Sequence, residues 1–109
     1  MDIEYLNDKL RNLCEKHKLA QKELGAECAK KLGIRLQNLE AACNVSELLL
    51  GRPHPLKGNR LGEFALDLTS GVRIVFKPNQ DPVPERNDGG INWAMVNKIT
   101  IVFIGDYHD

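Results

Sequence analysis

The sequence predicts an α+β fold in which helices from the first half of the chain pack on a sheet formed by the second half. Apolar residues recur at steps of three and four up to about residue 43, which is the period of a helix. From about residue 62 they alternate at every second position, as in a strand with one face in the core. With 109 residues, of which 42% are apolar and 28% charged, the chain has the size and composition of a single globular domain over residues 1–109.

The N-terminal half should contain two helices behind a short strand near residues 3–5. One apolar series predicts a helix over about residues 7–16, and a longer series predicts a helix over about residues 21–43. Gly25 and Gly33 weaken the longer helix, because a glycine inside a helix costs up to ~1 kcal/mol relative to alanine. The first half is therefore expected to be a helical pair.

The second half should begin with a β-hairpin. Large apolar side chains occupy every second position of residues 64–69 and 72–77, and Ser70-Gly71 between them supplies the turn. If the alternating apolar residues face the core, the period of two puts Arg73 and Lys77 together on the opposite face. The hairpin would then present two cations on its outer face.

A long loop and a closing strand should complete the second half. Residues 78–92 hold three prolines and two glycines without an apolar period, which predicts a loop longer than most in compact domains. Residues 93–104 end in a nearly continuous apolar run, which is typical of a strand covered on both faces. We therefore expect the two helices to pack across one face of a small twisted antiparallel sheet.

Composition excludes several classes of protein. No run of about 18 apolar residues exists, and the N-terminus carries acids where a signal peptide needs basic and apolar residues, so we expect a cytoplasmic protein without a membrane partner. The three cysteines are widely spaced and form no CxxC pair, so they are interpreted as reduced thiols. Because the sequence has no Gly-rich phosphate loop, zinc signature or paired-carboxylate motif, we expect neither a metal nor a small-molecule cofactor.

The charge distribution leaves room for an anionic partner. Fifteen basic and fifteen acidic residues give a net charge of zero, which by itself argues against binding to nucleic acid. Residues 51–77, however, carry five lysines and arginines against two acids, whereas residues 78–109 carry two against five. The middle of the chain is therefore a local basic patch.

Reactive side chains concentrate in two short segments, residues 52–60 and 106–108, and on the strand that carries Arg73 and Lys77. Cleavage of RNA by its own 2′-hydroxyl needs a base for that proton, an acid for the departing 5′-oxygen and cations for the charge on the phosphate. Histidine suits the first two tasks because its pKa of about 6.5 lets it exchange protons near neutrality. Arginine suits the third because it contacts phosphate bidentately. The side chains present therefore suit metal-free phosphodiester cleavage.

The motif HPLKG at residues 54–58, the hairpin with Arg73 and the closing Asp106-Tyr107-His108 follow one another in an order that resembles the RelE/ParE superfamily of type II toxins. The resemblance covers essentially the whole chain and is greatest to the HigB (plasmid maintenance killer protein) branch. It implies a compact RelE-like, microbial-RNase-like fold whose concave sheet face holds RNA. The activity implied is that of a ribosome-dependent endoribonuclease that cleaves mRNA and inhibits translation. The partners implied are the ribosome, mRNA and a cognate helix-turn-helix antitoxin of the HigA type.

The same resemblance implies roles for individual side chains. It implies a catalytic set of two histidines as acid and base, a tyrosine that stacks on or protonates the substrate, an aspartate that orients its neighbours, and a lysine and an arginine that clamp the phosphate: His54, His108, Tyr107, Asp106, Lys57 and Arg73. Arg60 and Lys77 are supporting candidates for RNA binding.

Two other functions remain open from the sequence. A ParE-like member of the superfamily would share the fold but inhibit DNA gyrase by binding it, without an acid, a base or a phosphate clamp. A catalytically degenerate member would only bind its antitoxin, which the neutral net charge makes conceivable. The joint presence of His54, Lys57, Arg73, Tyr107 and His108 favours cleavage over both.

Overall fold

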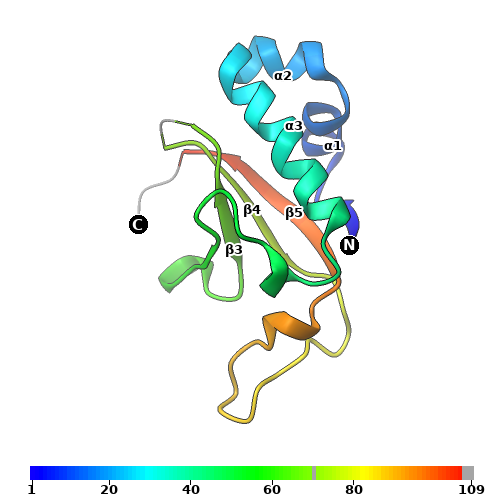
Figure 1. Ribbon diagram of the computed structural model, residues 1–109, viewed down its shortest axis with the longest axis vertical. Coiled ribbons are helices and arrows are strands. Elements are labelled where there is room, and N and C mark those ends of the chain that lie inside the picture. Colours follow the sequence, from blue (N-terminus) through cyan, green and yellow to red (C-terminus); the bar gives the residue numbers. More distant parts are fainter. Residues whose placement is uncertain (70, 107–109) are drawn as a thin grey trace.

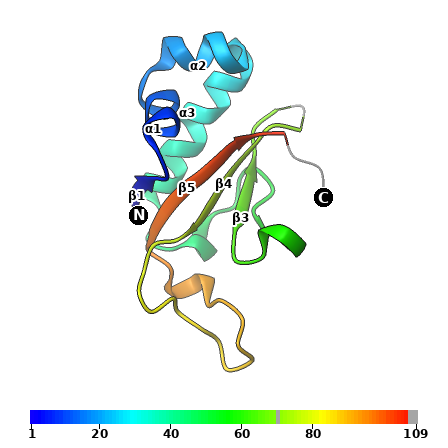
Figure 2. The ribbon, with the colours of Figure 1, turned by 180° about the vertical axis from the view of Figure 1, so that it is seen from behind.

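The computed structural model describes residues 1–69 and 71–106 and confirms the α+β class (Figure 1). Its strands are β1 (Asp2–Tyr5), β2 (His54–Pro55), β3 (Phe64–Asp67), β4 (Arg73–Pro78) and β5 (Lys98–Gly105), and its helices are α1 (Asp8–Glu15), α2 (His17–Leu24) and α3 (Ala26–Ala41). Short 3-10 turns occupy η1 (Val45–Glu47), η2 (Gly58–Arg60) and η3 (Trp93–Met95). Both views show the helices grouped together beside β5 (Figures 1 and 2). No helix in the described part of the chain is long and apolar enough to cross a membrane.

The sheet is mixed, so the prediction of a purely antiparallel sheet is wrong. Its strands lie in the order β1-β5-β4-β3-β2, and β1 pairs with β5 in parallel while the other pairs are antiparallel. The parallel pair joins two distant parts of the chain, with Ile3 opposite Ile99 and Tyr5 opposite Ile101. The apolar period of a strand sets which face is buried but carries no information on its direction relative to a distant strand.

The predicted helix over residues 21–43 is also wrong, because Gly25 breaks it. Gly25 has φ +87° and ψ 158°, a backbone conformation essentially restricted to glycine, and it ends α2 and begins α3. The described residues therefore form three helices, and the two predicted helices become α1, α2 and α3. The helix expected over residues 7–16 is confirmed as α1, and the side chain of Asn7 caps it by accepting a hydrogen bond of 2.9 Å from the Leu10 amide.

The predicted hairpin is confirmed as β3 and β4, with Asp67 opposite Arg73 at the turn end. The ladder from β4 to β5 contains a register shift, since Val75 lies opposite Phe103 and Phe76 opposite Ile101. One residue of β5, Val102, is therefore extra, as in a β-bulge.

The bulge lets β5 contribute to both faces of the sheet. Ile101 and Ile104 pack with the helices in the main core, whereas Val102 and Phe103 belong to a second cluster on the other face. That second cluster also contains the buried Leu56, Ala65 and Val75. The expectation of a closing strand packed on both faces is thus confirmed, although β5 begins at Lys98 and not at residue 93.

The expected loop after β4 is confirmed and forms an arm that extends away from the sheet (Figures 1 and 2). Gln80 ties the base of the arm together: its side chain donates to the Met95 carbonyl at 3.2 Å and accepts from the Asn97 amide at 2.8 Å. Trp93, at the end of the arm, packs against Phe64 with ring centroids 4.8 Å apart and the ring planes tilted by 59°. The arm is therefore anchored to the sheet at its base.

Two glycines of the helical layer should respond in opposite ways to alanine substitution. Gly25→Ala forces a side chain into the glycine-only conformation and should lower the free energy of unfolding by about 1–3 kcal/mol. Gly33 lies inside α3, and no atom outside its own helical turn lies within 4 Å of the position that a Cβ would take, so Gly33→Ala should gain up to ~1 kcal/mol. Urea denaturation of both variants measures the difference. Equal effects of the two substitutions would contradict the assigned break between α2 and α3.

Candidate functional site

A row of four residues crosses the sheet on the face opposite the helices. His54 on β2 pairs with Ala65 on β3, Ala65 pairs with Val75 on β4, and Val75 pairs with Phe103 on β5. Ala65 and Val75 are fully buried, so the middle of the row is an apolar floor. Because paired residues point to the same face, His54 and Phe103 lie at the two ends of this floor.

The backbone of Arg52 orients the ring of His54. The Nδ1 atom of His54 lies 2.8 Å from the Arg52 carbonyl oxygen. A carbonyl oxygen can only accept, so Nδ1 carries the proton and donates it to Arg52. In the neutral ring, Nε2 is then the unprotonated nitrogen. The contact thus leaves Nε2 of the half-buried imidazole as the nitrogen that could exchange a proton with a substrate.

Arg73 and Lys77 extend from the same face of β4, on either side of the buried Val75. Four residues of strand separate them, which is about 13 Å. Arg73 is mostly buried and its Nε donates to Asp67 Oδ1 at 3.1 Å, whereas Lys77 is exposed. The regular alternation of β4 from Arg73, opposite Asp67, to Lys77, opposite Thr100, confirms the shared face predicted for these two cations.

Asp67 connects several parts of the chain, and the sequence analysis gave it no role. Its carboxylate accepts hydrogen bonds from Arg73 and from Arg52, whose Nε lies 2.7 Å from Oδ2. Its backbone amide donates to the Gly51 carbonyl at 2.6 Å, and its carbonyl accepts from Nε of Arg35 at 3.3 Å. Arg35 is the one buried charged residue in the described part of the chain. Because it belongs to α3, its hydrogen bond to Asp67 also connects α3 to the sheet.

Opposing effects act on the acidity of Asp67. Burial raises the pKa of its carboxyl, but the hydrogen bonds and positive charges of Arg52 and Arg73 outweigh burial and hold the pKa below its ordinary value. The carboxylate is therefore ionised throughout the neutral range.

Arg60 lies over the far end of the row. Its guanidinium carbon is 4.6 Å from the centre of the Phe103 ring, and Nη1 forms a 2.7 Å ion pair with Glu63. The Phe103 ring in turn covers Gly105, where a Cβ would lie 3.0 Å from the ring edge. A side chain at position 105 would therefore displace the ring on which Arg60 rests.

Of the other predicted site residues, the structure describes Asp106 and Lys57. Asp106 follows the end of β5, and its carboxylate lies against Gly71 of the hairpin turn, where a Cβ would lie 3.4 Å from Oδ2. Lys57 is exposed at the start of η2. Tyr107 and His108 lie outside the described residues. No three His, Cys, Asp or Glu side chains cluster as ligands for a metal ion within residues 1–69 and 71–106.

The structure thus brings His54, Arg60, Arg73 and Lys77 to one face of the sheet. Sequence reasoning missed the residues that hold them: Arg52, which lay inside the reactive segment but had no role, Asp67 and Arg35. A signal existed for Asp67, because a hairpin turning at residues 70–71 places it opposite Arg73. The sequence contains no comparable signal for the long-range contact of Arg35 with Asp67.

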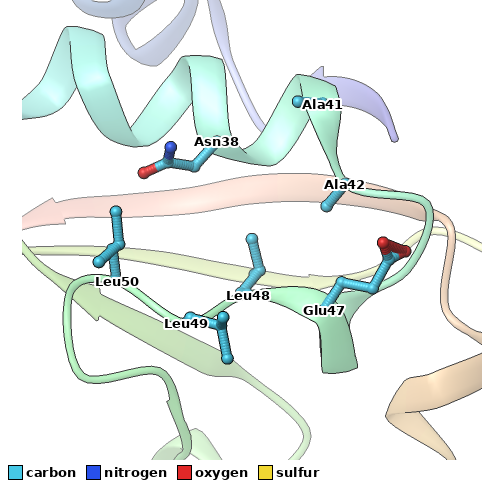
Figure 3. A pocket seen from close by; sticks show the side chains of 7 residues that line it. All are labelled: Asn38, Ala41, Ala42, Glu47, Leu48, Leu49 and Leu50. Carbon is cyan, nitrogen blue, oxygen red and sulfur yellow. The ribbon is translucent and has the colours of Figure 1, made fainter.

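A separate groove lies between the end of α3 and the segment after η1 (Figure 3). It is lined by Asn38, Ala41, Ala42, Glu47, Leu48, Leu49 and Leu50. Leu49 and Leu50 are 84% and 59% exposed. None of the predicted site residues lines this groove.

The fold is shared with known toxins of the YoeB/ParE type. A YoeB/ParE toxin from Agrobacterium tumefaciens superposes with a TM-score of 0.58 at 17% identity, over 99% of this chain and 100% of that one. A YoeB dimer and a heterotetrameric YoeB-YefM toxin-antitoxin complex, both from Staphylococcus aureus, each give a TM-score of 0.59 at 17% identity, over 100% of this chain and 98% of theirs. At this identity the likeness establishes the fold.

These neighbours are toxins of the RelE/ParE superfamily, the one that the sequence resembles. The more specific resemblance to the HigB branch stays a prediction. No family model matches the chain, and no curated protein matches it in sequence.

The lowered pKa of Asp67 makes its contribution to stability depend on pH. A carboxyl with a lowered folded-state pKa stabilises the fold fully above its unfolded-state pKa of about 3.9, and this contribution is lost as pH falls through the folded-state value. Asp67→Asn should therefore cost about 1 kcal/mol at neutral pH, since the carboxylate is partly exposed, and progressively less in acid. Urea denaturation of wild type and variant over a pH series measures the difference.

Asp8→Asn is the matched control, because the ion pair of Asp8 with Arg11 is exposed on α1. It should change stability less than Asp67→Asn at neutral pH. If the free energies of unfolding of wild type and Asp67→Asn differ by the same amount from neutral to acid pH, the charge of Asp67 contributes nothing to stability.

Proposed function

We propose that the chain is the toxin of a type II toxin-antitoxin system and a metal-independent endoribonuclease that cleaves mRNA on the ribosome. The observation that carries this proposal is the placement of His54 and Arg73 on the face of the sheet opposite the helices, joined through Arg52 and Asp67. Acid-base chemistry and phosphate binding both need such side chains within reach of one substrate. The inhibition of translation would follow from loss of the message.

Local charge supports an RNA substrate despite the neutral net charge. The segment 51–77, which forms β2, η2, β3 and β4, carries five basic and two acidic residues and so has a net charge of +3. Its two acids, Glu63 and Asp67, are each paired with arginines. A basic surface of this kind attracts the phosphate backbone.

We propose a division of labour in the reaction that combines the contact of His54 with Arg52 and the roles that the sequence resemblance implies. His54 takes the proton of the 2′-hydroxyl through Nε2, because Nδ1 is already bonded to Arg52. The 2′-oxygen forms a bond to phosphorus as the bond from phosphorus to the 5′-oxygen breaks. Arg73 and Lys57 stabilise the negative charge that gathers on the phosphate oxygens. His108 then protonates the departing 5′-oxygen, Tyr107 stacks on or protonates the substrate, and Asp106 orients them.

The proposal includes a protein partner. One of the structures that share the fold is a YoeB-YefM toxin-antitoxin complex. We propose by analogy that this chain is held inactive by a cognate antitoxin, of the helix-turn-helix HigA type that the sequence resemblance implies. Cleavage is proposed to take place in the cytoplasm, where ribosomes and mRNA are found.

Primer extension on mRNA in a translation reaction tests the proposal. Wild-type protein should cut the message only when ribosomes are active. His54→Ala and Arg73→Lys should each slow cleavage about a hundredfold, which corresponds to ~3 kcal/mol of lost transition-state stabilisation. Arg73→Lys keeps the positive charge and removes the planar guanidinium. Slower cleavage by this variant would therefore show that the reaction depends on the shape of the guanidinium and not on its charge alone.

His17→Ala is the matched control, because His17 is an exposed histidine at the start of α2. It should cleave like wild type. An intact message with wild-type protein would reject the nuclease, and inhibition of DNA gyrase in a supercoiling assay would then favour the ParE-like alternative.

A further inference from the structure

Arg52 is a second arginine beside Arg73 that the proposed catalytic set does not include. Its Nε lies 2.7 Å from Asp67 Oδ2 and its Nη2 lies 3.3 Å from Asp67 Oδ1, so the contact is bidentate. Arg73 Nε donates to the same Oδ1 at 3.1 Å. Two guanidinium groups from separate parts of the chain therefore meet at one carboxylate.

These two guanidinium groups lie on the candidate RNA face. Asp67 lies opposite Arg73 in the hairpin, and the period of two puts its side chain on the same face as Ala65. Arg52 reaches that carboxylate from the loop before β2, and its side chain is 61% exposed. The carbonyl oxygen of Arg52 also contacts the ring of His54. His54, Arg52 and Arg73 are therefore positioned by one connected set of contacts that passes through Asp67.

The backbone around Arg52 is built to hold this position. Gly51 and Arg52 have φ values of +83° and +49°, and a left-handed conformation in a non-glycine residue persists only where its surroundings impose it. The Gly51 carbonyl accepts from the Asp67 amide at 2.6 Å, and a Cβ on Gly51 would lie 2.5 Å from Nε of Arg35. These contacts hold the loop close to Arg35 and to the backbone of Asp67, and leave no room for a side chain at position 51. The side chain of Arg52 is thereby placed within reach of the Asp67 carboxylate.

We infer that Arg52 is a second phosphate-binding residue for single-stranded RNA, and that Asp67 is a positioning residue that holds Arg52 beside Arg73. Asp67 binds the edge of Arg52 formed by Nε and Nη2, so a phosphate would bind the other edge, formed by Nη1 and Nη2. A guanidinium already oriented loses less entropy when it binds. The pair would contact neighbouring phosphates of one strand while Asp67 keeps the two positive charges from repelling each other. This inference rests on the proposed function, since it places the RNA backbone across the same face.

The salt dependence of RNA binding tests the inference without requiring cleavage. The probe is a fluorescent single-stranded RNA with 2′-O-methyl groups, which the proposed chemistry cannot cut. For single strands, each phosphate contact adds about 0.7 to the steepness with which log affinity falls with log salt concentration. Arg52→Gln should therefore flatten this dependence by about 0.7, and Arg52→Lys should restore most of it.

Arg86→Gln is the matched control, because Arg86 is 59% exposed and paired with Asp88 on the arm, and the substitution removes the same charge. It should leave the salt dependence at the wild-type value. The inference is overturned if wild-type protein does not bind the RNA, if folded Arg52→Gln keeps the wild-type dependence, or if Arg86→Gln flattens it equally. Circular dichroism checks that each variant is folded.

The two proposals fail in different ways. Cleavage of mRNA together with an unchanged salt dependence in Arg52→Gln would reject the role of Arg52 and leave the nuclease standing. A flattened dependence without any ribosome-dependent cleavage would leave a phosphate-binding pair and reject the nuclease.

Discussion

The contacts of Asp67 are the constraint on which the rest of this structure depends. One residue binds Gly51 and Arg35 through its backbone and Arg52 and Arg73 through its carboxylate. Those contacts join α3, the loop before β2 and the hairpin, which are distant in sequence. Because a buried charge is stable only when it is hydrogen-bonded, the buried Arg35 requires partners such as the Asp67 carbonyl.

The same contacts connect the helical layer to the candidate site. Arg35 is buried in α3 and reaches the backbone of Asp67 beside Gly51, and Gly51 precedes the residue whose carbonyl holds His54. A shift of α3 along the sheet would therefore disturb the loop that orients the imidazole. The chemistry of the outer face is in this way supported by packing on the inner face.

The sheet also explains how a neutral chain can present a basic surface. The bulge in β5 sends Val102 and Phe103 to the outer face, where they form an apolar floor with residues of β3 and β4. The basic segment 51–77 forms the strands and the turn around that floor, whereas the acids at positions 81, 85 and 88 belong to the arm beyond β4. The two signs of charge that composition averages to zero are therefore already separated along the sequence, and the fold assigns them to different elements.

The sequence by itself determined the elements whose causes are local. The hairpin, the long loop, α1 and the shared face of Arg73 and Lys77 follow from side-chain period and turn residues, which act over a few positions. Only the tertiary structure decided the parallel pairing of β1 with β5, the break at Gly25, the bulge and the contacts of Asp67 with Arg35, Gly51 and Arg52. Strand direction and the contacts of Arg35 and Arg52 depend on residues far apart in the chain, and no local pattern encodes which distant partner a side chain will meet.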